Sequence, residues 1–139
     1  MKIAQSALDE VYAHASEGYP NEICGMLVAR RGSTLVMGIK RATNANTDRP
    51  RDTYEIAPRE HTRIERECDS EGLDIVGYYH SHPDHESYAS IRDRESAWPK
   101  YQYLIVSVMT GKVAKSKVFE RVGWDTTDMP EGSLEVVPH

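Results

Sequence analysis

Cysteine is scarce in this chain of 139 residues, which contains only Cys24 and Cys68. Two cysteines are too few for the disulfide framework of a small secreted domain, so we expect both to be reduced core residues. No apolar run approaches the roughly 20 residues of a membrane-spanning helix. The N-terminus also has no basic start followed by an apolar block, which a signal peptide would show. These absences predict a cytoplasmic protein with no membrane partner.

Basic residues are also in deficit, because 17 Lys and Arg face 22 Asp and Glu, for a net charge of −5. Nucleic-acid-binding domains usually carry a basic stripe, and this chain has only short arginine clusters, so we expect no nucleic-acid partner. Only one phenylalanine is present, but eight tyrosines add surface that can be buried. The length suits one domain with a modest core.

The order of helical and strand-like patterns predicts an α/β fold with a mixed sheet and helices packed on it. The expected helices cover residues 2–17, 58–70 and 90–98, and the expected strands cover 23–30, 33–41, 53–56, 73–82, 102–109 and 112–122. Residues 42–52 are rich in turn formers and should form a loop. We expect a catalytic domain over 1–122 and a C-terminal tail over 123–139, which shows no clear period.

Three of the six histidines fall in the stretch HSHPDH, residues 80–85. His80 and His82 are two apart at the end of a strand, so alternation places both imidazoles on one face. Pro83 keeps His82 extended. Two parallel imidazoles on a rigid strand suit a transition metal, although such a pair alone is a weak signal.

Ser90 and Asp93 have the spacing of a helix capping box. The same position keeps the Asp93 carboxylate ionised and can aim it at His80 and His82. Two histidines and one aspartate leave a fourth tetrahedral position open, as in a catalytic zinc site. His85 competes as a ligand, but a solvated histidine explains it more simply.

Peptide hydrolysis also needs a carboxylate that takes a proton from water and passes it to the leaving amine. Glu22 is the candidate, because it lies in PNEICG directly before an apolar strand. A solvated glutamate at a strand start is the alternative, and position alone favours that alternative.

These residues together resemble the JAMM (MPN-plus) metalloprotease domain, whose motif is a glutamate far upstream of H-x-H-x(7)-S-x-x-D. Seven residues separate His82 from Ser90 here, and TYEIAPRE (53–60) is also similar to bacterial members. The resemblance covers about residues 3–120. One departure is Ala89, where many relatives have proline.

The resemblance implies a cytidine-deaminase-like α/β fold and a zinc hydrolase. By motif position, His80, His82 and Asp93 are implied as zinc ligands, Glu22 as the general acid/base, and Ser90 as the oxyanion donor. Family members cut amide or isopeptide bonds at the C-termini of ubiquitin-like proteins. Small bacterial members resemble enzymes that process sulfur carriers with a diglycine tail, so a ubiquitin-like sulfur-carrier protein is the expected substrate partner. An extended tail would add to a strand edge, and Arg49 and Arg51 are candidates to clamp it.

Three other functions stay open at this point. The first is a non-catalytic interaction module on the same fold, although such relatives usually lack several of the motif residues. The second is a deaminase, which would need H-x-E and P-C-x-x-C, and no C-x-x-C occurs here. The third is a RadC-like, DNA-repair-associated protein, against which the acidic balance argues.

Overall fold

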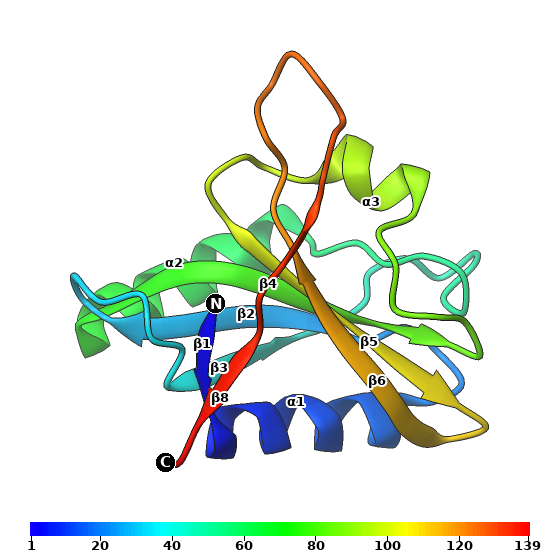
Figure 1. Ribbon diagram of the computed structural model, residues 1–139, viewed down its shortest axis with the longest axis horizontal. Coiled ribbons are helices and arrows are strands. Elements are labelled where there is room, and N and C mark those ends of the chain that lie inside the picture. The colour runs from blue at the N-terminus through cyan, green and yellow to red at the C-terminus, as the bar shows by residue number, and fades with distance from the viewer.

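A six-stranded mixed sheet forms the centre of the computed structural model, which describes all 139 residues (Figure 1). The strand order is β3-β2-β4-β5-β6-β7, and only the central pair β4–β5 is parallel. A separate parallel pair joins β1 to β8. The strands are β1 (Lys2–Ala4), β2 (Cys24–Arg30), β3 (Gly38–Ala42), β4 (Leu73–Pro83), β5 (Gln102–Met109), β6 (Lys112–Phe119), β7 (Glu131–Gly132) and β8 (Glu135–Val137). The helices are α1 (Gln5–Gly18), α2 (Pro58–Glu71) and α3 (Ile91–Ser96).

The two long helices cover opposite faces of the sheet, as alternation along the strands requires. Leu27 of β2 packs in the cluster that contains the buried face of α1. Its neighbours Met26 and Val28 pack with Ile64 and Cys68 of α2. The two cysteines are buried and free, as predicted. The mixed α/β architecture predicted from the sequence is therefore confirmed.

The first helix begins later than predicted. Lys2–Ala4 form β1 and pair with Glu135–Val137 of β8, so the helix starts at Gln5 instead of residue 2. The segment after residue 123, which shows no period in the sequence, supplies both β7 and β8. Its last strand thus lies beside the first residues of the chain (Figure 1).

The strand expected over 53–56 is wrong. Its backbone joins no ladder, and Glu55 instead bonds residues of the preceding loop, with its N–H donating to Asn44 Oδ1 at 3.2 Å and its carbonyl accepting from Ala45 N–H at 2.8 Å. Three other elements are shorter than predicted. These are β3, which begins at Gly38, α3, which covers only Ile91–Ser96, and β6, which ends at Phe119.

The second helix agrees closely with its sequence signals. Pro58 occupies its first turn, and Gly72 ends it with a φ of 71°. This left-handed conformation favours glycine, which explains why the helix stops there. No helix in the structure has the length and apolar character needed to cross a bilayer.

Candidate metal centre

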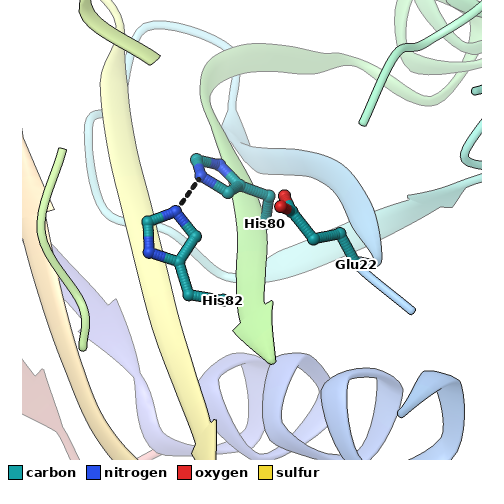
Figure 2. Close-up of side chains that lie close together, drawn as sticks. All are labelled: Glu22, His80 and His82. Carbon is teal, nitrogen blue, oxygen red and sulfur yellow. Dashed lines mark hydrogen bonds between the residues drawn. The ribbon is translucent and has the colours of Figure 1, made fainter. Parts of the chain in front are cut away.

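The C-terminal end of β4 carries His80 and His82 on one face of the sheet, as alternation predicts. Their Nε2 atoms lie 3.2 Å apart (Figure 2). His80 is fully buried, and His82 is 7% exposed. Along this end β5 pairs with β4 from Gly77 to Pro83, and β2 pairs with it on the other side as far as His80. Both imidazoles therefore stand on backbone that the sheet fixes.

The capping box at the start of α3 aims Asp93 at these histidines. Ser90 Oγ accepts a hydrogen bond from Asp93 N–H at 3.1 Å, and Asp93 Oδ2 accepts one from Ser90 N–H at 3.0 Å. Asp93 Oδ1 lies 3.2 Å from His80 Nε2, and its Oδ2 lies 3.2 Å from His82 Nε2. One carboxylate thus reaches both imidazoles while it caps the helix.

These separations fit a zinc ion. Bonds of about 2.0–2.2 Å in tetrahedral geometry place two donor atoms roughly 3.3 Å apart. The two imidazole Nε2 atoms are 3.2 Å apart, and each of them lies 3.2 Å from a different oxygen of Asp93. His82 Nδ1 bonds the Glu86 carbonyl at 2.9 Å, which fixes its proton there and leaves the Nε2 lone pair free for a metal. His80 Nδ1 is buried without a partner, and the Tyr54 ring stacks on this imidazole at 4.5 Å.

Glu22 joins the cluster through the register of β2 on β4. Cys24 pairs with His80, so two residues earlier Glu22 comes opposite His82 and on the same face. Its carboxylate and the two imidazoles lie within 4.8 Å of one another (Figure 2). Glu22 is only 5% exposed, so the alternative of a solvated glutamate is wrong.

Two residues that the sequence did not single out hold Glu22 in place. Ser81 Oγ accepts from Ile23 N–H at 2.9 Å, and Ser81 N–H donates to the Ile23 carbonyl at 3.1 Å. The Asn44 side-chain amide donates to the Glu22 carbonyl at 3.1 Å and to the Thr53 carbonyl at 3.0 Å. The sequence did carry a signal for Ser81. It lies between His80 and His82 on one strand, so alternation points its side chain to the face opposite the two imidazoles. Asn44 stands in a stretch full of turn formers and gave no comparable signal.

The two carboxylates of the cluster have opposite protonation tendencies. Burial raises the pKa of Glu22 to about 8, so the metal-free protein holds a proton there at neutral pH. Burial acts in the same direction on Asp93, but His80, His82 and the Ser90 N–H outweigh it and hold the pKa of Asp93 well below its usual value. One group can therefore carry a proton while the other stays anionic, a division of labour typical of hydrolytic sites.

The two histidines are also inequivalent. Burial lowers the pKa of His80, and the nearby Asp93 opposes this only in part. Burial acts the same way on His82, but hydrogen bonds to Asp93 and to the Glu86 carbonyl outweigh it and raise the pKa of His82. A metal needs neutral imidazoles, so its binding would displace the proton that Asp93 attracts to this pair.

Comparison with known proteins decides the family. The family model described as prokaryotic homologs of the JAB domain matches residues 4–122. Desampylase from Haloferax volcanii is 38% identical over 112 residues, which are 77% of this chain and 80% of that protein. The chain belongs to the JAB family.

Two solved structures agree with this membership in their fold. A protein from Desulfitobacterium hafniense superposes with a TM-score of 0.84 at 26% identity, over 100% of this chain and 94% of that one. A structure described as a JAMM metalloprotease-like zinc site in the proteasome and signalosome superposes with a TM-score of 0.58 at 20% identity, over 99% of this chain and 97% of that one. The JAB-family chain therefore shares the fold of that zinc-site structure, and its Glu22, His80 and His82 form a group of donors that can hold a metal ion. The role of each residue in the cluster stays a prediction.

The remaining histidines of this JAB domain lie outside the cluster. His85 is exposed in the loop that follows β4. His14 bonds Tyr79 Oη at 2.8 Å, and His61 bonds Tyr78 Oη at 2.9 Å. Both contacts tie a helix to β4, which is a packing role.

The two arginines of the 42–52 loop are bonded to neighbouring carboxylates. Arg49 pairs with Asp52 at 3.1 Å, and Arg51 lies 3.6 Å from Asp84. All four side chains are well exposed, so these pairs are weak. The clamp on an extended tail stays a prediction.

A pocket of about 290 Å³, the aromatic pocket, opens beside Asp93. Its aromatic walls are Tyr54, Tyr78, Trp98 and Tyr103. Of the residues of the metal centre, Asp93 therefore borders this pocket, which lies near the end of α3.

Proposed function

We propose that this JAMM isopeptidase cleaves the amide bond that follows the C-terminal diglycine of a ubiquitin-like sulfur carrier, and that it releases an amino acid or peptide. The observation that carries the proposal is the cluster of two imidazoles 3.2 Å apart, each 3.2 Å from an oxygen of Asp93, with the buried Glu22 beside them. The substrate class is supported by the relative desampylase, whose name denotes removal of a ubiquitin-like protein. A cytoplasmic location stays a prediction.

His80, His82 and Asp93 are the residues that would hold zinc. The ion supplies Lewis acidity, which activates water and polarises the scissile carbonyl. His82 contributes a fixed tautomer through the Glu86 carbonyl, and Asp93 contributes a negative charge that its capping bonds orient. The rest of the chemistry falls to the side chains around the ion.

Glu22 is the group that would move the proton. It lies within 4.8 Å of both imidazoles, and burial raises its pKa to about 8 in the metal-free protein. A bound cation would lower that pKa toward neutral pH, where a general acid/base works best. Glu22 takes the proton of the attacking water and then gives it to the departing amine. Ser81 bonds the backbone of Ile23 and Asn44 bonds the backbone carbonyl of Glu22, so the backbone that carries this carboxylate is held in place.

Ser90 is the proposed donor to the oxyanion. Its Oγ accepts the capping bond from Asp93 N–H, so its own O–H proton is not used in that bond. The hydroxyl can therefore donate to the carbonyl oxygen as negative charge develops there. A single donor of this kind typically contributes about 10²–10³ in kcat.

The test is mass spectrometry of a sulfur carrier whose diglycine tail is extended by one amino acid. The zinc-loaded protein should release that amino acid, and a chelator should stop the release. Glu22→Gln should keep zinc while turnover falls about 10²–10⁴-fold, because a general acid/base is lost. Glu10→Gln, an exposed glutamate of α1, is the matched control and should behave as wild type. Full turnover in Glu22→Gln would remove Glu22 from the mechanism.

A further inference from the structure

Two tryptophans meet on the surface near the end of α3. Trp98 is 59% exposed and Trp124 is 67% exposed, yet their rings touch edge to face with centroids 6.0 Å apart. Val122, which is 66% exposed, lies two residues before Trp124. We call Trp98 and Trp124 the tryptophan surface. Large exposed apolar residues that gather in this way mark interaction sites, whereas single ones do not.

The loop over residues 120–130 that carries Trp124 is firmly held. Arg121 is 8% exposed and donates to the carbonyls of Ala97 at 2.9 Å, Thr126 at 2.9 Å and Glu95 at 3.3 Å. Its guanidinium also lies 5.4 Å from the centre of the Trp124 ring. One buried arginine therefore ties the loop to the end of α3 and supports the tryptophan at the same time.

The base of this loop is closed as well. Glu120 N–H donates to the Pro130 carbonyl at 3.3 Å, and Val122 N–H donates to the Asp128 carbonyl at 3.0 Å. Met129 is buried in a core cluster with Ala97, Tyr103 and Phe119. Figure 1 shows this loop projecting beside α3, at the end of the molecule opposite α1. Trp124 is therefore presented on a fixed support, which lowers the entropy cost of binding through it.

The tryptophan surface adjoins the metal centre through a shared pocket. Trp98 forms one wall of the aromatic pocket, and Asp93 lies in the same pocket. A protein whose C-terminal tail reaches the metal centre would bring its folded body to the rim of this pocket. The tryptophans are what that body would meet first.

Exposed acidic residues outnumber exposed basic ones within four positions of either tryptophan in the chain, where Lys100 is the one exposed base. Glu95, Asp125 and Asp128 are exposed, and none of them forms an ion pair. The complementary partner has an apolar patch bordered by lysine or arginine. Such an arrangement, an aromatic centre with a charged rim, is typical of protein interfaces.

We propose that the tryptophan surface docks the folded body of the ubiquitin-like substrate, through an apolar patch with a basic border. The proposal rests on the proposed function, because it assigns the substrate of the same site. Trp98 and Trp124 act here as recognition residues, and they take no part in bond breaking.

The experiment compares two substrates with one scissile bond: the intact carrier with its extended diglycine tail, and a peptide that contains only its last residues. Trp124→Ala should lower kcat/KM for the intact carrier by at least about fivefold, mainly through KM, because an interface anchor is lost. The same variant should cleave the peptide at the wild-type rate. Val136→Ala, an exposed apolar residue on β8, is the control and should change neither rate.

A binding measurement makes the test independent of turnover. Calorimetry should show that the intact carrier binds the wild-type protein more tightly than Trp124→Ala, and that replacing Asp125 and Asp128 by lysine weakens binding most at low salt. Equal binding of the intact carrier by wild type and Trp124→Ala would overturn the docking proposal.

A second outcome would also overturn it. If the wild-type protein is a dimer and Trp124→Ala is a monomer, the tryptophan surface joins two copies of this chain. If the carrier binds through Trp124 but neither substrate is cleaved, the docking proposal stands and the proposed function fails.

Discussion

The metal centre and the tryptophan surface are adjacent, yet they are built in opposite ways. The centre gathers polar side chains where water is excluded, with Glu22 at 5% and His80 at 0% exposure. The tryptophan surface places apolar side chains in water, with Trp124 at 67% exposure. Ionic and hydrogen-bonding partners stabilise the polar side chains of the buried centre. The buried Arg121 holds the backbone that carries the exposed tryptophans.

The difference separates chemistry from recognition. Polar groups in a buried site interact strongly and keep a fixed orientation, which suits metal binding and proton transfer. Exposed aromatic groups gain free energy only when a partner covers them. The family match covers residues 4–122, so it contains the whole centre, whereas Trp124 lies beyond its end. The matched region therefore contains the whole metal centre and one of the two proposed docking residues, Trp98, whereas the other, Trp124, lies outside it.

The largest expected effect is the loss of zinc and of all cleavage in a variant of the metal centre, whereas a variant of the tryptophan surface should keep its zinc. Asp93→Asn should lower zinc affinity by at least about a hundredfold and abolish cleavage of both the carrier and the peptide, since an anionic donor becomes neutral. Asparagine can still accept the capping bond, so the fold should persist. Trp124→Ala should keep full zinc content by elemental analysis. Stoichiometric zinc in Asp93→Asn would exclude Asp93 as a ligand.

A second test asks whether burying the Glu22 carboxyl in the metal centre lowers the free energy of unfolding at high pH. The pKa of Glu22 is about 8 in the folded metal-free protein, against an ordinary value of 4.5. Between these values the folded state holds a proton that the unfolded state has released, so this contribution to stability is present below pH 4.5 and is lost as the pH rises through about 8.

Glu22→Gln removes this titration, because glutamine stays neutral at every pH. In chelator-treated protein the variant should therefore exceed wild type in unfolding free energy by on the order of a few kcal/mol at pH 9, and by almost nothing at pH 4.5. Denaturant titrations at the two pH values measure the difference, and Glu10→Gln should show no such pH dependence. A pH-independent difference for Glu22→Gln would mean that Glu22 is ionised even when buried.

The smallest expected effect concerns the capping box that serves the centre. Ser90→Ala removes the bond from Asp93 N–H to Ser90 Oγ and should lower the free energy of unfolding by about 1 kcal/mol. Ser90→Thr should restore most of this loss, because a threonine hydroxyl caps almost as well. Equal stability of wild type and Ser90→Ala in denaturant would show that the cap contributes nothing.

The sequence predicted those parts of the fold that depend on local rules. Pro58 and Gly72 bound α2 because their backbone preferences hold in any context. The strand predicted over 53–56 was wrong, because this segment joins no sheet. Its residue Tyr54 instead stacks its ring on His80. Lys2–Ala4 fit a helical pattern as well as a strand, and only their pairing with residues more than 130 positions later decided between them.

For the site, the sequence by itself determined how His80, His82, Ser90 and Asp93 are oriented, because strand alternation and helix capping act within a few residues. The sequence named Glu22 only as a candidate and through the family motif, and tertiary structure decided that it joins them, since Glu22 reaches the histidines through the register of β2 on β4. The meeting of Trp98 with Trp124 was decided in the same way. Contacts between residues distant in the chain depend on how whole elements pack, and no local pattern records that packing.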